Sequence, residues 1–348
     1  MAKELIGSLE LNRIYQMDCL EGMQLLPDDS VDLIVIDPPY NIGKDKRWDK
    51  WRSVDDYVAW MTDVFRECER VLKPNGSFYW FHNDLPQIRK LMNTIDDNTS
   101  FIFKQFIVWN KRFEGAKLKG YLDAHIAVDG LRNYKQMAEY ILFYTFQDGT
   151  GLSKINADKN CFASIKKYLD DELEKSGYTE QTIKDVLGNQ MTSHYFGFSK
   201  REKTQFLLPT DSNYKKLQST GYFTRPYKSL RQEYESLRQE YEKQRYVFNN
   251  QKTHHSVWNY EVAPKIGHIT PKPVELIENI IRHSSGEGAI VLDCFMGSGT
   301  TAVAAAKLNR NFIGFEREPE YVNIANQRLE NVYDEPAERK LTEGETEK

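Results

Sequence analysis

The segment Val291–Thr300, with the sequence VLDCFMGSGT, constrains the fold of this chain more than any other segment. A short apolar run typical of a buried strand leads into a tight Gly-x-Gly turn and then into a helical pattern. Glycine adopts backbone angles that other residues avoid, and it lets a ligand approach the main chain closely. A strand, a loop and a helix in this order belong to a mostly parallel sheet with helical crossovers. We therefore expect an α/β fold with a ligand at the loop.

An acidic residue beyond the next strand supports a cofactor site at this loop. Glu316 follows Gly297 by 19 residues, directly after the predicted strand 312–315. An acid about 20 residues beyond such a loop suits hydrogen bonds to ribose hydroxyls, and the start of the helix suits a carboxylate. Ala302 replaces the last glycine of a GxGxxG pattern, which by itself does not exclude a nicotinamide cofactor. A tight turn without a ligand is the alternative for an isolated Gly-x-Gly pair.

Strand and helix patterns alternate on both sides of a middle segment that lacks this rhythm. The predicted strands are 13–17, 31–36, 77–81, 104–109, 139–145, 289–293 and 312–315, and the predicted helices are 54–72, 273–284, 300–308 and 319–329. The sequence Lys-Pro-Asn-Gly at 73–76 predicts a turn. We expect a catalytic half at 10–148, a mostly helical insertion at 149–256, a cofactor-binding half at 257–333 and a disordered acidic tail at 334–348.

The composition excludes several classes of protein. The four cysteines are far apart, with no Cys-x-x-Cys pair, so neither a structural zinc site nor a disulfide framework is expected. No stretch approaches the ~20 apolar residues that a membrane-spanning helix needs, and the N-terminus lacks the pattern of a signal peptide. We expect a cytoplasmic protein with no membrane association and no metal. The net charge of -4 neither favours nor excludes nucleic acid as a partner.

The apolar run VDLIVI at 31–36 ends in Asp37-Pro38-Pro39-Tyr40. A carboxylate at the carboxyl end of a parallel strand points into the ligand crevice. The two prolines stiffen the turn and lack N–H groups, so nearby carbonyl groups can accept hydrogen bonds from a ligand. An acid, carbonyls and the ring of Tyr40 together suit a planar aromatic amine, which is a poor nucleophile because its lone pair is delocalised. Asp37 could localise that lone pair and accept the proton lost on reaction. A stiff surface turn is the alternative.

Together, DPPY at 37–40 and FMGSGT at 295–300 resemble the motifs of DNA amino-methyltransferases, and their order resembles that of the β group. The segments QMDC at 16–19 and HITPKP at 268–273 resemble further family segments, the second with Ile and Pro where the family signature HPTQKP has Pro and Gln. The resemblance implies S-adenosylmethionine as cofactor and S-adenosylhomocysteine as product. It also implies a Rossmann-like sheet of seven strands in circularly permuted order, with the insertion as a target-recognition domain.

The resemblance further implies roles for individual residues. The catalytic residues would be Asp37, Pro38, Pro39 and Tyr40, acting on a base flipped out of duplex DNA. The residues expected to bind the cofactor are Asp18, Cys19, Asp37, Thr270, Lys272, Asp293, Phe295, Gly297, Ser298, Gly299, Thr300 and Glu316. Family members with DPPY mostly methylate adenine N6, whereas SPPY favours cytosine N4. Methylation at cytosine C5 is rejected because the chain has no Pro-Cys pair.

Basic residues are concentrated in the insertion, as contact with phosphates requires. Residues 151–256 hold 18 Lys and Arg against 13 Asp and Glu, although the whole chain carries a net charge of -4. The candidates for DNA contact are Lys111, Arg112, Lys117, Lys119, Lys200, Arg201, Lys203, Lys215, Lys216 and Arg225, the first four on a loop at 111–119 that is expected to be mobile. An ordinary solvated face is the alternative. Helices at 162–175 and 179–187, with Gly177 at the break, could form a helix-turn-helix-like unit.

The heptapeptide SLRQEYE occurs twice in succession from 229 to 242. It places Leu230, Tyr234, Leu237 and Tyr241 at spacings of four, three and four, which makes one apolar seam on one helix. Packing of this seam within its own domain is favoured over a contact between two copies of the chain.

Other functions stay open on the sequence alone. Within methyl transfer, cytosine N4 of DNA or adenine of RNA could be the substrate. A non-catalytic DNA-binding protein could keep the fold, whereas a nicotinamide oxidoreductase is disfavoured because DPPY has no role there. Besides double-stranded DNA, the expected partners are a cognate restriction endonuclease and a second copy of the chain.

Overall fold

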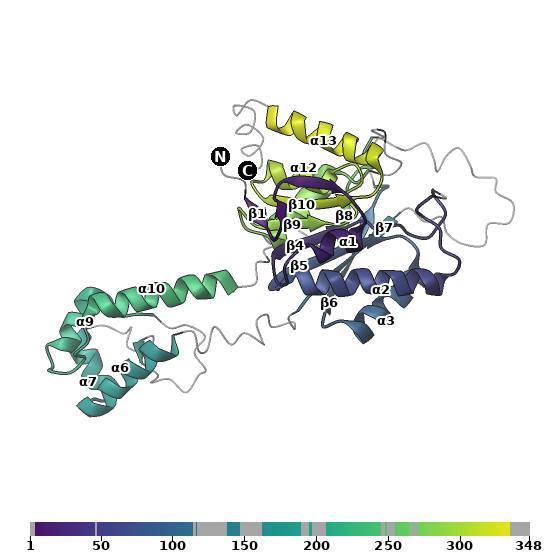
Figure 1. Cartoon of the computed structure of the whole chain (residues 1–348). Coiled ribbons are helices and arrows are strands. Elements are labelled where there is room, and N and C mark those ends of the chain that lie inside the picture. Colours follow the sequence, from purple (N-terminus) through teal and green to yellow (C-terminus); the bar gives the residue numbers. More distant parts are fainter. Residues whose placement is uncertain are drawn as a thin grey trace. The chain divides into compact units, whose positions relative to one another are not determined.

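The computed structural model describes residues 4–45, 47–113, 116, 138–146, 162–188, 195–196, 207–244, 248, 255–264, 267 and 271–334. Contacts within the chain separate two compact units, residues 1–149 with 247–348, and residues 150–246 (Figure 1). Within the described ranges, no helix has the length and apolar character needed to cross a membrane.

The first unit is built on one sheet of eight strands. Across the sheet these are β3 (Arg13–Gln16), β10 (Asn311–Glu316), β9 (Ile290–Asp293), β4 (Val31–Ile36), β5 (Leu72–His82), β7 (Ala138–Thr145), β6 (Ile102–Asn110) and β8 (Val257–Asn259). β7 runs antiparallel to both of its neighbours, and the other neighbouring strands are parallel. The expected α/β class and mostly parallel sheet are confirmed. The sheet has one strand more than expected, because three residues pair with the end of β6 to form β8.

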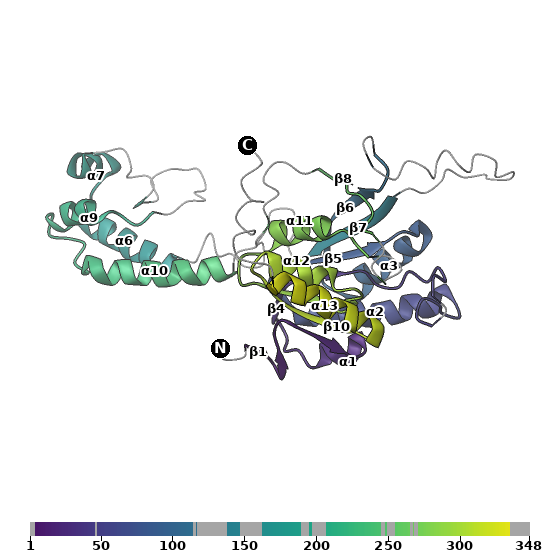
Figure 2. The ribbon, with the colours of Figure 1, turned by 90° about the horizontal axis from the view of Figure 1, so that it is seen from above.

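Helices cover both faces of this sheet (Figures 1 and 2). One face carries α1 (Cys19–Gln24), α2 (Val54–Val71) and α3 (Leu85–Asn98), and the other carries α11 (Val274–Ser284), α12 (Thr300–Lys307) and α13 (Pro319–Asp334). A small hairpin of β1 (Leu5–Ile6) and β2 (Leu9–Glu10) precedes the sheet. Because both faces of β4 are covered, VDLIVI is a continuous apolar run rather than an alternating one.

The two ends of the sequence interleave in the sheet. β9 and β10, from the C-terminal part, lie between β3 and β4, from the N-terminal part. Ile34 of β4 stands opposite Leu292 of β9, and the two strands run parallel. Their carboxyl ends therefore meet at one edge of the sheet, where the turn after Ile36 lies beside the loop after Asp293.

The segment 73–76 does not form the simple turn that the sequence predicts, because the structure includes it in β5. The pairing moves from Leu72 to Ser77 on β5 while it advances by only two residues on β4. Pro74 has no N–H to donate to a ladder, so this stretch bulges out of the pairing. The Lys-Pro-Asn-Gly sequence thus makes an irregularity inside the strand.

The sequence patterns also miss helices α1 and α3. α1 has only six residues, too few for a helical period to be visible. α3 carries start signals that sequence analysis could have used, because Asp84 accepts a hydrogen bond from Gln87 N–H and Pro86 stands in the first turn.

The second unit is a cluster of helices. These are α6 (Ala163–Ser176), α7 (Glu180–Leu187), α9 (Asp211–Gln218) and α10 (Tyr227–Gln244). Gly177 ends α6 with a φ of 64°, which a glycine adopts without strain. α6 and α7 lie where the sequence predicts two helices. Their use as a helix-turn-helix-like unit stays a prediction, since residues 189–194 lie outside the described part of the chain.

The apolar seam of α10 packs within this unit. Leu230 is fully buried, and Tyr234 and Leu237 pack against the same core. The ring of Tyr234 stacks on Phe162 with 4.7 Å between centroids. The side chain of Tyr241 lies outside the described residues. The described part of the seam therefore packs within its own unit, as the favoured interpretation of the sequence expects.

The packing of α1 on the sheet gives a stability prediction at Gly22. A Cβ at this position would lie 2.4 Å from the ring of buried Phe315. We expect Gly22→Ala to lower the free energy of unfolding by about 1–3 kcal/mol in urea titrations, because overpacking outweighs the better helix propensity of alanine. Gly286→Ala is the matched control, since nothing lies within 4 Å of its Cβ position. Equal stability of the two variants would contradict this close packing.

Candidate active site

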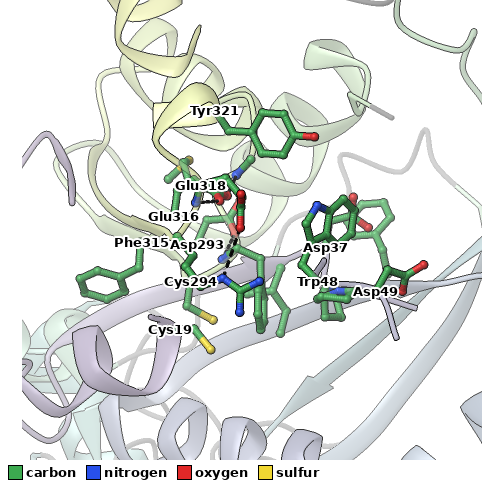
Figure 3. A pocket seen from close by; sticks show the side chains of 18 of the residues that line it. Cys19, Asp37, Trp48, Asp49, Asp293, Cys294, Phe315, Glu316, Glu318 and Tyr321 are labelled. Carbon is green, nitrogen blue, oxygen red and sulfur yellow. Dashed lines mark hydrogen bonds and ion pairs between the residues drawn. The ribbon is translucent and has the colours of Figure 1, made fainter. Parts of the chain in front are cut away.

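A cavity of about 370 Å³ opens at the carboxyl edge of β3, β10, β9 and β4 (Figure 3). It lies within the first unit and joins the turn after β4 to the loop after β9. The predicted site residues that line it are Asp18, Cys19, Asp37, Pro38, Pro39, Tyr40, Lys272, Asp293, Phe295, Gly297, Ser298, Thr300 and Glu316. Thr270, also predicted, lies outside the described residues. The structure thus brings together two motifs from opposite ends of the chain.

Both oxygens of the Asp37 carboxylate have partners within the protein. The Tyr40 hydroxyl donates to Oδ1 over 2.6 Å, and the Lys272 ammonium pairs with Oδ2. Lys272 is only 7% exposed, whereas Asp37 is 24% exposed and lines the cavity. Burial alone would lower the pKa of Lys272, but the carboxylates of Asp37 and Glu139 outweigh burial and raise it. Lys272, predicted to bind the cofactor, therefore holds Asp37 in this structure.

A second carboxylate, Glu139, lies behind this pair and was not predicted from the sequence. It is on β7, is 4% exposed, and lies 3.4 Å from the Lys272 ammonium through Oε2. Its Oε1 pairs with Lys111. Burial would raise the pKa of Glu139, but the two lysines outweigh burial and lower it to about 2. Lys111, predicted to contact DNA, is therefore part of the buried charge cluster.

The turn after β4 is held by a second set of hydrogen bonds. The Tyr57 hydroxyl donates to the carbonyl of Pro39 over 2.7 Å, and the Gln87 amide donates to the carbonyl of Tyr40 over 3.2 Å. The ring of Tyr40 packs on His82 with centroids 4.6 Å apart, and burial lowers the pKa of His82 to about 4, so this ring is neutral. Among the described residues, none donates to the carbonyl of Pro38, which faces no competitor for a ligand N–H.

The loop after β9 is fixed by its own acid and by the acid of β10. Asp293 accepts hydrogen bonds from the Thr301 hydroxyl over 2.6 Å and from Phe295 N–H over 2.9 Å. Gly297, with a φ of 51°, donates its N–H to Glu316 over 2.7 Å. Burial raises the pKa of Asp293 to about 7, and burial also raises the pKa of Glu316.

Gly299 has a packing role rather than a position on the cavity wall. Its φ is 80°, and a Cβ there would lie 2.7 Å from the Cβ of Ala325 on α13. The glycine therefore allows α12 and α13 to approach each other. On the cavity wall, Asp18 caps α1 by accepting from Leu20 N–H, and burial raises the pKa of the neighbouring Cys19 thiol.

A tryptophan-rich segment after the turn forms a wall of the cavity that sequence analysis missed. Trp48, Asp49 and Trp51 line the cavity, and Arg47 lies 3.6 Å from Glu318 on the segment after β10. Asp49 is 1% exposed, and its Oδ1 and the Trp48 indole N–H have no hydrogen-bond partner in the described structure. The sequence signal was present, since WDKW follows DPPYN within a few residues. Both atoms are buried, so neither is presented to a ligand in the cavity.

The predicted DNA-contact residues fall into three groups. Lys117, Lys119, Lys200, Arg201 and Lys203 lie outside the described residues. Lys111 is in the buried cluster with Glu139, and one guanidinium nitrogen of Arg112 is buried without a partner. The last three, Lys215, Lys216 and Arg225, are in the second unit.

In the second unit, two lysines of α9 are exposed and one arginine is used internally. Lys215 is 70% exposed and pairs with Asp211, and Lys216 donates to the carbonyl of Leu187. Arg225 pairs with Glu233 over 2.6 Å and lies over the ring of Tyr168. Arg225 therefore ties helices of its unit together. In the described ranges, no group of three or more His, Cys, Asp or Glu side chains could hold a metal ion.

Comparison with known proteins gives a consistent set of relatives. A family model described as DNA methylase matches residues 31–327. Type II methyltransferase M1.MboII of Moraxella bovis is 30% identical over 321 residues, 91% of this chain and 96% of that protein. DNA adenine methyltransferase YhdJ of Escherichia coli (strain K12) is 27% identical over 334 residues, 92% of this chain and 83% of that protein. A Thermus thermophilus structure, assigned as a DNA modification methylase and complexed with S-adenosyl-L-methionine, has a TM-score of 0.50 at 19% identity, over 93% of this chain and 95% of that chain.

The buried carboxyl of Asp293 gives a prediction for stability against pH. Folding raises the pKa of Asp293 from 3.8 to about 7, so the folded protein keeps this proton at pH values where the unfolded chain has lost it. The free energy of unfolding is therefore highest below the unfolded pKa and falls as the pH rises toward 7. Asp293→Asn resembles the protonated acid. We expect the stability of this variant, relative to the unchanged chain, to rise by a few kcal/mol between about pH 4 and pH 7 in urea unfolding. A difference that stays constant over this range would contradict the raised pKa.

Proposed function

Because this chain belongs to the DNA methylase family, we propose that it transfers the methyl group of S-adenosylmethionine to N6 of an adenine flipped out of duplex DNA. One observation carries the proposal. A single cavity is lined both by the carboxylate that heads the rigid DPPY turn and by the glycine loop with its acid, Glu316. A target amine at Asp37 and a cofactor at the loop would therefore meet in one space.

The residues around the cavity fit S-adenosylmethionine. Its volume of about 370 Å³ is within the range of pockets for small molecules. The acids Asp18 and Glu316 and the ring of Phe295 suit an adenosine, by hydrogen bonding to hydroxyls and by stacking. The start of α12 at Thr300, on the cavity wall, suits the carboxylate of an amino acid. When bound, the cofactor supplies an electrophilic methyl group, and S-adenosylhomocysteine is the product.

The turn after β4 would prepare the amine for attack. Asp37 accepts one N–H of the amine, and the carbonyl of Pro38 accepts the other, since Tyr57 already holds the carbonyl of Pro39. These two bonds localise the nitrogen lone pair, which makes the amine a better nucleophile toward an electrophilic methyl group. The packing of Tyr40 on His82 keeps the turn rigid. Asp37 then accepts the proton that the methylated amine loses and passes it to water.

Adenine is favoured over cytosine as the target base. The turn begins with Asp37 rather than serine, and the relative YhdJ is named as a DNA adenine methyltransferase. Cytosine N4 is the second candidate, because its amine would fit the same two acceptors. A target within a duplex must leave the base stack to reach this cavity.

The second unit is proposed to read the DNA target, with the exposed lysines of α9 on the phosphates. Its sequence carries more basic than acidic residues, although the whole chain is acidic. A restriction endonuclease partner, pairing of two copies and a cytoplasmic location stay predictions.

The catalytic role of Asp37 is tested by methyl transfer from labelled cofactor to mixed-sequence duplex DNA, followed by nucleoside analysis. We expect N6-methyladenine from the unchanged chain and about 10²–10⁴-fold less product from Asp37→Ala. Asp32→Asn is a control on the same strand, because Asp32 also pairs with a lysine, at 2.7 Å, but lies away from the cavity. N4-methylcytosine would overturn the base assignment, and no product on any duplex would leave an RNA substrate or a non-catalytic binder.

The phosphate role of α9 gives a second test. Lys215→Ala should weaken DNA binding to a similar degree on all sequences and reduce the slope of log affinity against log salt by about 1. Lys90→Ala is the control, since Lys90 is also exposed and paired with an aspartate, but in the first unit on α3. A salt slope that is equal for the two variants would remove Lys215 from the DNA interface.

A further inference from the structure

The structure presents Asp37 with both oxygens in use. The Tyr40 hydroxyl holds Oδ1 and the Lys272 ammonium holds Oδ2. Each carboxylate oxygen can accept two hydrogen bonds, so a target amine either shares Asp37 with these donors or displaces one of them. A displaced donor needs another acceptor, and the presence of that acceptor then affects how often the amine is bound to Asp37.

Displacement of Lys272 would be unfavourable without a second acceptor. Lys272 is 7% exposed, so its ammonium has little access to water. Removing the partner of a buried charge is strongly destabilising, because the charge stays desolvated and unpaired. Tyr40 is 6% exposed, so its hydroxyl would also be left buried without an acceptor, at a lower cost than a buried charge.

Glu139 is the second acceptor that both donors can reach. Its Oε2 lies 3.4 Å from the Lys272 ammonium and 3.5 Å from the Tyr40 hydroxyl. A hydroxyl has one proton, so Tyr40 donates to Asp37 or to Glu139 at any one time. Each donor could pass from Asp37 to Glu139 by a small side-chain movement.

The surroundings of Glu139 hold it in place for this exchange. Its other oxygen, Oε1, pairs with Lys111, which fixes the carboxylate. Oε2 then faces Lys272 and the Tyr40 hydroxyl. The side chain is 4% exposed and is not part of the cavity wall. Glu139 is therefore screened from a base or cofactor and can act on the reaction only through Lys272 and Tyr40.

We propose that Glu139 is a positioning residue, which takes over Lys272 and the Tyr40 hydroxyl when the target amine binds Asp37. After the exchange both ammonium groups stay paired, through Glu139, and Asp37 is bound by the amine in place of its cation. The proposal rests on the proposed function in one respect, that the ligand of Asp37 is an amine. It applies equally to adenine and to cytosine.

The test compares steady-state methylation by variants on a DNA that the unchanged chain methylates. Glu139→Gln keeps the shape but not the charge, so Lys272 should stay on Asp37. We expect kcat to fall by about 10–100-fold, with the KM for DNA and the cofactor Kd within about three-fold, because DNA affinity depends mainly on phosphate contacts. Asp32→Asn should keep kcat within about two-fold.

Two further variants separate this role from a structural one. Glu139→Gln combined with Lys272→Met removes the competing cation, and it should be at least about five-fold faster than Glu139→Gln alone. Glu139→Asp keeps the carboxylate and should also be faster than Glu139→Gln. If Glu139 had only a structural role, the double variant would be slower than Glu139→Gln alone, because a second buried partner would be lost.

The outcomes distinguish this proposal from the proposed function. An unchanged chain that methylates no DNA overturns both. An active chain whose Glu139→Gln variant keeps its kcat, or loses cofactor binding in step with kcat, overturns the role of Glu139 alone. A double variant or a Glu139→Asp variant that is no faster than Glu139→Gln also overturns it.

Discussion

The parallel pairing of β4 with β9 is the contact on which the site depends. Hydrogen-bonded strands lie about 4.8 Å apart, so the turn after one strand and the loop after the other end within the span of one small molecule. Leu33 stands opposite Val291 and Ile34 opposite Leu292, and all four side chains are buried. The helices on both faces make this central position possible, because they cover a strand pair that has no polar face of its own.

Electrostatics adds a second constraint to this edge of the sheet. Two carboxylates and two ammonium groups lie together, and the groups of Lys272 and Glu139 are almost without contact to water. Such a cluster is a poor source of stability compared with apolar packing. Its presence makes sense if the charges serve the site, since the chain would otherwise gain stability from hydrophobic side chains in their place. The cluster holds the carboxylate of Asp37 in place through Lys272.

The sequence predicted the parts of the site that follow from local chemistry. The buried strand before Asp37 and the glycine loop before α12 each carry their signal within ten residues, so both were located correctly along the chain. Glu139 carries no such signal, because its partners come from segments far away in the sequence and meet it only through the antiparallel strand β7. Arg225 was predicted to contact DNA because of its charge. Its ion pair with Glu233, on the next helix, was missed for the same reason. Short elements such as α1 and β8 were missed because they contain too few residues for a period.

The place at which the second unit enters the sequence has an evolutionary consequence. The chain leaves the sheet after β7, at Thr145, and returns to it at β8, which begins at Val257. The strands that carry the turn and the glycine loop, β4 and β9, are complete without any residue of the inserted unit. Recombination could therefore replace that unit as a cassette, or lengthen and shorten it, while the reacting groups keep their places. On the proposed role of that unit in reading DNA, new target sequences would then arise by exchange of one segment, without renewed selection on the chemistry.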